Sequence, residues 1–171
     1  MKLILIIPLL FSIAGLGQTT STKIRKLPTS KYQGFYWYGK DVEKSSIGAL
    51  LIYPETDSTV LFYIDLNRGA PSYNMGSLYG RIKVINDSGI FYSESDSLGS
   101  LGKGCKFLMQ FFQNKIKIET IEDYYDCGFG YGVDVDGEFI KKSNKKIDYF
   151  EDQEGKKIYF EKTKPQEYYK N

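Results

Sequence analysis

The sequence contains no histidine, and only two of its 171 residues are cysteines. Without an imidazole, Ser-His-Asp and Cys-His arrangements for nucleophilic catalysis cannot be built, and any general base must be a carboxylate, a tyrosine or a lysine. A Cys/His zinc site is excluded as well, because it needs four ligands of those two types. We therefore expect a protein that is not an enzyme and that has no cofactor and no metal.

An excess of charge of one sign is also absent, since 23 lysines and arginines accompany 21 aspartates and glutamates, for a net charge of +2. The basic residues gather only in two short groups, at 23–26 and 141–146. Nucleic-acid binding needs a basic patch or stripe that neutralises several phosphates. We expect no nucleic-acid partner.

Long apolar runs are limited to the N-terminus, where the segment Leu3–Phe11 is too short to span a bilayer. It is followed by the small-residue stretch Gly15-Leu16-Gly17, which is typical of a cleaved signal peptide. We predict a signal peptide over residues 1–17, with cleavage before Gln18 and no lipid anchor, because no cysteine lies nearby. No later segment is apolar for long enough to cross a membrane, so the predicted location is exported, either periplasmic or extracellular.

Residues that favour strands and turns are abundant: 15 tyrosines, 11 phenylalanines and 17 glycines. Apolar side chains recur at every second position in short segments, and no sustained helical repeat is present. The predicted strands include 50–53, 60–64, 82–85, 107–112, 116–119 and 158–161, each bounded by a turn sequence. Turns this short join sequential antiparallel strands, so the predicted fold is an all-β antiparallel meander.

A meander of this kind must protect its free edges, either by closing into a barrel or by folding into two packed sheets. We predict a small up-and-down, lipocalin-like barrel, with a β-sandwich as the alternative. The domain is expected to cover residues 31–163. The polar segment 18–30 is predicted to be a flexible leader, and 164–171 a frayed tail.

The two cysteines, Cys105 and Cys127, are predicted to form a disulfide, since an exported chain folds in an oxidising compartment. The glycines at 128, 130 and 132 alternate with aromatic residues, which indicates a strand with one bare face that another backbone approaches closely. The following segment 133–140 is typical of two strands joined by an Asp-Gly hairpin turn.

The aspartates of this region allow two more specific functional interpretations, a calcium site and a hydrolase site. Asp134 and Asp136 match two places of a calcium-binding hand, but two other ligands and the flanking helices are missing. Paired carboxylates also serve in glycoside hydrolysis, so a carboxylate-based hydrolase built on Asp134, Asp136, Asp123 and Asp126 is the enzyme alternative. Polar alternation on a solvent-exposed face explains these residues more simply.

Binding is therefore the predicted function, and the long connection 67–76 is its main candidate. It carries Arg68, Tyr73, Asn74 and Met75, residues of types that are common in recognition loops and interfaces. The alternative is a loop packed over one end of the barrel with Tyr73 and Met75 pointing inward. A second aromatic candidate surface is formed by Tyr124 and Tyr125. The partner is expected to be a protein, a small molecule or a glycan.

Two short patterns resemble those of known exported proteins. The segment Ser88–Tyr92, followed by Lys103-Gly104, is similar to the Ser-Gly-x-x-Tyr and Lys-Gly elements of bacterial C-type lysozyme inhibitors. That resemblance implies that Ser88, Tyr92 and Lys103 contact lysozyme, and inhibition of a cell-wall hydrolase is the alternative function. The pattern of Cys105 followed by 127–130 resembles exported bacterial proteins to which no function is assigned.

Overall fold

The computed structural model describes residues 27–93 and 104–170. The predicted signal peptide and Lys103 lie outside these residues. The described part contains a 3₁₀ helix, ten strands and one short α-helix: η1 (Pro28–Lys31), β1 (Gly34–Tyr38), β2 (Ile47–Pro54), β3 (Thr59–Asn67), β4 (Met75–Lys83), β5 (Ser88–Ser93), β6 (Cys105–Phe111), β7 (Lys115–Tyr125), β8 (Gly137–Ser143), β9 (Tyr149–Glu151), β10 (Lys157–Tyr159) and α1 (Pro165–Tyr168). The predicted all-β class is confirmed.

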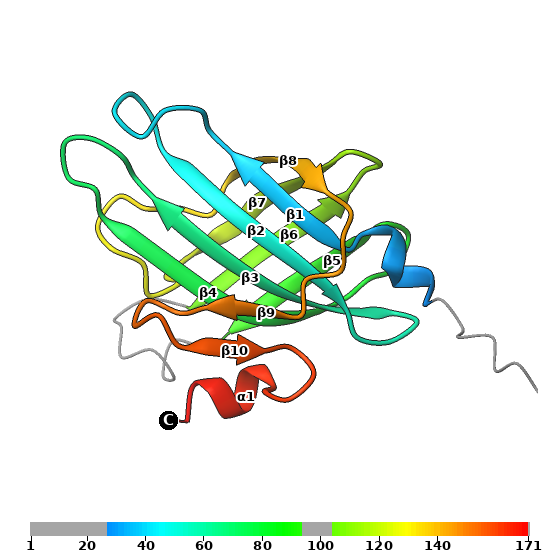
Figure 1. Cartoon of the computed structure of the whole chain (residues 1–171). Coiled ribbons are helices and arrows are strands. Elements are labelled where there is room, and N and C mark those ends of the chain that lie inside the picture. The colour runs from blue at the N-terminus through cyan, green and yellow to red at the C-terminus, as the bar shows by residue number, and fades with distance from the viewer. Residues whose placement is uncertain (1–26, 94–103, 171) are drawn as a thin grey trace, which may run out of the picture.

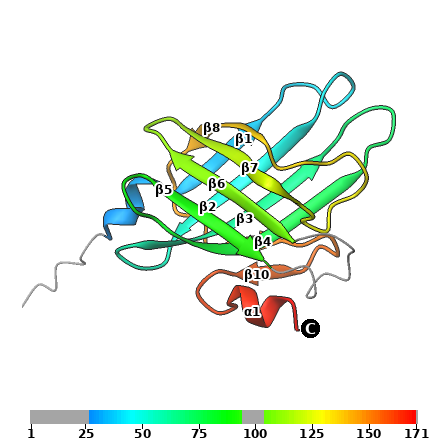
Figure 2. The same ribbon diagram turned by 180° about the vertical axis from the view of Figure 1, so that it is seen from behind.

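Strands β1–β8 form one antiparallel sheet that curves into a nearly closed barrel (Figure 1). Their order is β4-β3-β2-β1-β8-β7-β6-β5, so sequential strands are neighbours and the pairing of β1 with β8 joins the two halves. Strands β4 and β5 are the edges, and the isolated bridge between Ile85 and Ser88 links them at their turn. The predicted meander that closes into a barrel is confirmed. Figure 2 shows the molecule turned by 180°, so that the wall made by β5, β6 and β7 faces the viewer.

The barrel interior is filled by side chains. Alternate residues of each strand point inward, and the largest fully buried ones include Phe62, Phe107, Met109 and Phe139. The rings of Phe62 and Phe107 meet edge to face with their centroids 5.8 Å apart. Burying one such side chain contributes about 1.5–3 kcal/mol, so this core supplies much of the stability. These side chains form one hydrophobic core inside the barrel.

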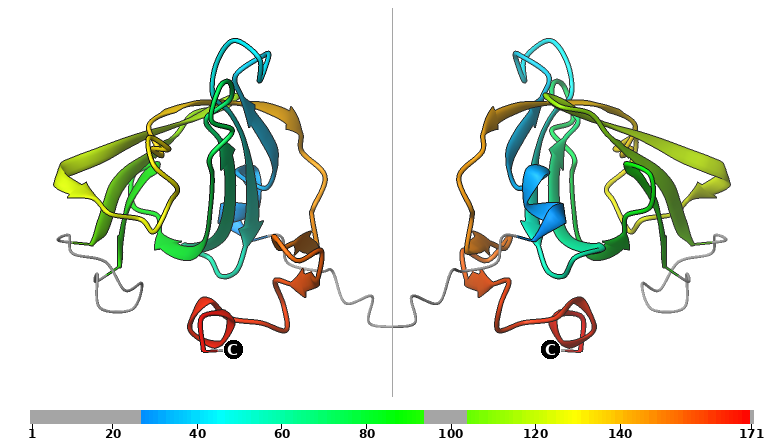
Figure 3. Two further views of the ribbon diagram at one scale, coloured as in Figure 1. Left: turned by 90° about the vertical axis from the view of Figure 1, so that its left-hand side faces the viewer. Right: turned by 90° about the vertical axis from the view of Figure 1, so that its right-hand side faces the viewer.

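Strand β3 is buried on both of its faces, because a second core covers the outside of β2–β4. The hairpin β9–β10 and helix α1 lie over this outer wall, as Figure 3 shows. The ring of Phe150 stacks on Tyr63 with centroids 3.9 Å apart, and Tyr168 packs edge to face on Tyr79. These contacts extend the domain beyond the predicted boundary at residue 163.

Residues 164–170 belong to the segment predicted to fray, and in the structure they include helix α1. Helix α1 packs on the outer core, and the hydroxyl of Tyr169 accepts a hydrogen bond from the Tyr79 N–H at 2.9 Å and donates one to the Tyr79 carbonyl at 3.1 Å. Because β4 is a sheet edge, this hydroxyl satisfies backbone groups that would otherwise be unpaired. The tail therefore protects an edge of the barrel.

The end of the predicted flexible leader is also ordered. Thr29 in η1 is buried, and its hydroxyl donates a hydrogen bond of 2.6 Å to the carbonyl of Thr56 in the β2–β3 turn. The ordered domain thus begins before residue 31. In residues 27–93 and 104–170, no helix is long and apolar enough to cross a membrane.

Candidate functional site

The predicted binding loop lies at one end of the barrel, between the end of β3 and the start of β4. Its neighbour is the β1–β2 connection, and the two loops are joined by bonds from the Ala70 N–H to the Val42 carbonyl at 2.9 Å and from the Tyr73 hydroxyl to Glu43 at 2.5 Å. Tyr73 is 41% exposed and Met75 48% exposed. Both side chains thus present surface to solvent at this end.

The predicted glycine-aromatic strand and the Asp-Gly hairpin are wrong. Residues 126–136 form an irregular connection, and β8 begins only at Gly137. The backbone at Gly128 and Gly132 has φ values of +72° and +73°, which favour glycine and turn the chain away from an extended path. The segment therefore follows a looped course at the same end of the barrel as the predicted binding loop.

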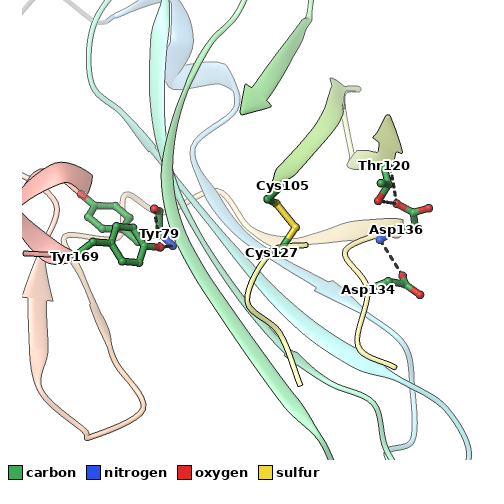
Figure 4. The surroundings of a disulfide bond; sticks show 7 residues. All are labelled: Tyr79, Cys105, Thr120, Cys127, Asp134, Asp136 and Tyr169. Atoms are coloured by element: carbon green, nitrogen blue, oxygen red, sulfur yellow. Dashed lines mark hydrogen bonds between the residues drawn. A yellow bond between two sulfur atoms is a disulfide. The ribbon is translucent and has the colours of Figure 1, made fainter. Parts of the chain in front are cut away.

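The predicted disulfide between Cys105 and Cys127 is confirmed, with an S–S distance of 2.02 Å and Cα atoms 4.5 Å apart (Figure 4). Cys105 is the first residue of β6, and Cys127 lies in the connection that follows β7. The bond therefore fixes the start of this connection to the barrel wall.

The looped segment packs directly against the predicted binding loop. The Gly130 N–H donates to the Met75 carbonyl at 2.9 Å, and the Tyr131 carbonyl accepts hydrogen bonds from the side chains of Asn74 at 2.6 Å and Arg68 at 3.3 Å. The Arg68 guanidinium also lies 5.7 Å from the centroid of the Tyr131 ring. Arg68 and Asn74 therefore hold two loops together, and Tyr131, 87% exposed, extends from the joint.

Tyr131 was not among the predicted site residues. Its neighbours in the sequence are glycines, and this alternation predicts a strand with one bare face rather than a loop with an exposed anchor. An aromatic side chain between two glycines is nevertheless an indication of this role, because glycines leave no side chains to cover it.

Two of the four aspartates of the hydrolase alternative, Asp134 and Asp136, support the loop itself. The carboxylate of Asp136 accepts hydrogen bonds from the backbone N–H and the hydroxyl of Thr120, at 2.6 and 2.7 Å, and Asp134 accepts one from the Asp136 N–H at 3.1 Å (Figure 4). Thr120 lies in β7, so Asp136 connects the loop to the barrel wall. These carboxylates are used as structural acceptors.

The remaining predicted residues lie on the wall. Tyr92 is 52% exposed on β5, its ring centroid is 6.0 Å from that of Tyr124, and the Lys106 amine lies 5.1 Å above the Tyr124 ring. Ser88 is at the opposite end of β5, where its hydroxyl donates to the Ile85 carbonyl at 3.1 Å. Tyr125 ends β7. The structure brings Tyr92 and Tyr124 together, but it separates them from Ser88.

A second concave site lies on the outside of the barrel and was not predicted from the sequence. The segment 143–151 passes over the outer faces of β1–β3 and leaves a cleft of about 690 Å³. Phe35, Leu51 and Tyr63 line it from the barrel wall, and Asp65 is the acidic residue of that wall. The Oδ1 atom of Asp65 is buried, and no residue in 27–93 or 104–170 forms a hydrogen bond with it.

Comparison with family models, with curated proteins and with solved structures finds no significant match to this chain.

Proposed function

We propose that the protein is a non-catalytic binding module that recognises a protein partner with the loop end of its barrel. The observation that carries this proposal is the group of three exposed apolar side chains, Tyr73, Met75 and Tyr131, on loops that are bonded to one another. Exposed aromatic and methionine side chains are enriched at interfaces. We name these three residues the loop-end anchors.

The loops that carry the anchors are held in place before any partner arrives. Hydrogen bonds join the β3–β4 loop to both of its neighbours, and the disulfide ties one of those neighbours to β6. Ordering a loop on binding costs free energy, so loops that are already ordered retain more of the contact energy. The filled barrel beneath them also favours recognition at the surface over recognition inside.

Export is part of the proposal. A disulfide is stable in an oxidising compartment, which supports the predicted periplasmic or extracellular location. N-terminal sequencing of the protein from its natural source should give a chain that begins at Gln18. A chain that begins at Met1 would contradict the predicted cleavage.

The test is capture of a partner from the extracellular and envelope fractions of the producing organism by the immobilised protein. Tyr131→Ala should reduce capture about tenfold or more, because an aromatic anchor typically contributes over 1 kcal/mol to binding. Tyr159→Ala is the control, since Tyr159 is also an exposed tyrosine, 41% exposed, and lies on β10, outside the loop-end anchors. Equal capture by both variants, or no enriched protein with the wild type, would refute the proposal.

Inhibition of lysozyme is the second candidate, and one observation favours it. The edge strand β5 presents Ile90, 55% exposed, and Tyr92, 52% exposed, on its outer face. Purified C-type lysozyme should then lose activity in the presence of the protein, and Tyr92→Ala should restore that activity while Tyr131→Ala does not. Full lysozyme activity at a large excess of the wild-type protein would remove this candidate.

A further inference from the structure

The cleft on the outer wall has a small side chain, Ala49, at its base and aromatic side chains beside it. Ala49 on β2 lies directly opposite Asp65 on β3, and Trp37 on β1 pairs with Ala49 on its other side. The short side chain of Ala49 leaves space beside the carboxylate. Tyr63, stacked on Phe150, forms a wall next to that space. The cleft is shallow and largely open to solvent, and its space of about 690 Å³ is enough to admit a small organic molecule.

Asp65 is an acidic residue in this apolar setting, and its polar groups are poorly compensated by the surrounding described residues. Its Oδ1 atom is enclosed and accepts no hydrogen bond, and burial raises the pKa of this carboxyl above its ordinary value of 3.8. A buried acceptor that has left water without gaining a partner costs free energy, so it needs a partner from elsewhere.

The lysines near the cleft do not supply that partner. Lys146 lies at the rim, but its amine is bonded to Glu161 at 2.9 Å and sits 4.8 Å from the centroid of the Tyr53 ring. Lys145 also lines the rim, and across residues 27–93 and 104–170 neither lysine forms an ion pair with Asp65. The half-buried carboxylate therefore has no basic partner among these lysines, and its charge is left to be compensated from outside the protein.

We propose that this cleft binds a small organic ammonium ion, which pairs with the carboxylate of Asp65 while its apolar part lies against Phe35, Leu51 and Tyr63. A cation compensates the buried negative charge, and the aromatic faces attract it further. This site is separate from the loop-end anchors, so the proposal does not depend on the proposed function.

Other ligand classes fit these residues less well. Within the described ranges no three Cys, Asp or Glu side chains gather to hold a metal ion, so a divalent cation would find one carboxylate where it needs several oxygens. An anion would be repelled by Asp65. A neutral hydroxyl would satisfy the acceptor but would leave the charge uncompensated.

The experiment is a titration of the ¹⁵N-labelled protein with 2-phenylethylammonium, followed by backbone amide shifts. The neutral analogue 2-phenylethanol has the same ring and chain and tests the role of the charge. We expect saturable shifts at residues 49, 65 and 145–150 with the ammonium, and binding about tenfold or more weaker with the alcohol, since a hydrogen bond between charged groups is roughly twice as strong as a neutral one.

Two variants connect the binding to Asp65. Asp65→Asn keeps the shape and removes the charge, so affinity for the ammonium should fall about tenfold or more while affinity for the alcohol stays the same. Glu119→Gln is the matched control, because it makes the same change at an exposed residue of β7, on the far side of the barrel. It should leave both affinities unchanged.

Several results would overturn the proposal. These are equal affinity for the ammonium and the alcohol, an unchanged ammonium affinity in Asp65→Asn, shifts that map outside the cleft, or no saturable shifts with either probe. Tyr131→Ala separates this site from the proposed function, because that variant should lose partner capture and keep ammonium binding.

Discussion

Replacing Asp65 by asparagine is expected to stabilise the protein at neutral pH, although most substitutions of half-buried residues destabilise. The wild-type carboxylate lies on an apolar wall, and its Oδ1 atom has no partner. An amide carries no charge, so it is cheaper to keep in the same place. A higher stability of the variant would indicate that Asp65 lowers the stability of the folded protein and serves binding instead.

The magnitude follows from the partly buried charge, because asparagine keeps polar atoms in the same place and removes only the charge. Leaving a buried polar or charged group without a partner costs about 1–3 kcal/mol, and we take about 1 kcal/mol for the charge because Asp65 is only half-buried and is partly solvated. In a domain of this size, a change of 1 kcal/mol moves the melting temperature by about 2–4 °C. The variant should therefore melt about 3 °C above the wild type at pH 7.

The gain should depend on pH in a defined direction. Burial raises the folded-state pKa of Asp65 above its ordinary value of 3.8, so the folded protein holds this proton more tightly than the unfolded chain does. The cost of the carboxylate is present in full above the folded-state pKa and disappears below the unfolded-state value. The advantage of Asp65→Asn should be complete at pH 7 and should vanish towards pH 3.

The assay is thermal unfolding followed by circular dichroism at pH 7, 5 and 3.5, after refolding from denaturant to remove any bound ligand. Glu119→Gln serves as the control and should show little change, since exposed ion pairs contribute little. If Asp65→Asn melts lower than the wild type at pH 7, the carboxylate has a stabilising partner in the folded protein. The reasoning about the cleft would then be refuted.

Three further predictions concern the fold. Cys127→Ser should lower the free energy of unfolding by about 3 kcal/mol in urea titrations, because the Cys105 bond closes a 22-residue separation, and an unchanged midpoint would contradict this. Burial alone would raise the pKa of Glu55. Hydrogen bonds from Arg81 and Lys164 together have the larger effect and hold the pKa of this carboxyl below its ordinary value of 4.5. The stability that this ion pair contributes is present above the unfolded-state pKa and is lost as pH falls through the folded-state pKa. Glu55→Gln should therefore lower the free energy of unfolding by about 1–2 kcal/mol at pH 7 and by little at pH 3. An equal loss at the two pH values would refute the ion pair. Tyr169→Phe should cost about 1 kcal/mol through loss of its two bonds to the edge of β4, with the same m-value, and no loss would show that the hydroxyl does not protect this edge.

The features that the sequence predicted are those that local patterns determine. Alternating apolar residues and short turns specify sequential antiparallel strands, and the meander follows from them. An even pair of cysteines in a chain expected to be exported leads to the disulfide. Neither inference needs knowledge of which distant segments meet.

The wrong predictions concern segments whose conformation is decided by distant partners. The Asp-Gly pair at 136–137 resembles a hairpin turn, but Asp136 bonds to Thr120 in β7 and the disulfide holds Cys127 at the start of β6. The tail has little apolar content of its own, and its helix is stabilised by packing of Tyr168 on Tyr79 and Phe150. Local propensity could not reveal these contacts.

The sequence also contains an indication of the outer cleft. The run 60–64 in β3 is apolar at every position, which is typical of a strand covered on both faces rather than on one. Asp65 follows directly and continues the outer row begun by Leu61 and Tyr63. An acid in a row that is otherwise covered by protein is a candidate for a functional role. The segment that covers the row could not be identified from sequence alone.

The C-terminal covering of β2–β4 also has a consequence for the order in which the chain is made. Synthesis proceeds from the N-terminus, so β2–β4 emerge long before the residues that cover their outer wall, among them Phe150, Ile158 and Phe160. Strand β1 likewise waits for β8 before the two halves of the barrel can join. A nascent chain therefore presents an uncovered aromatic wall until residues 150–160 have appeared, and a ribosome that stops near residue 145 would release a sheet prone to aggregate.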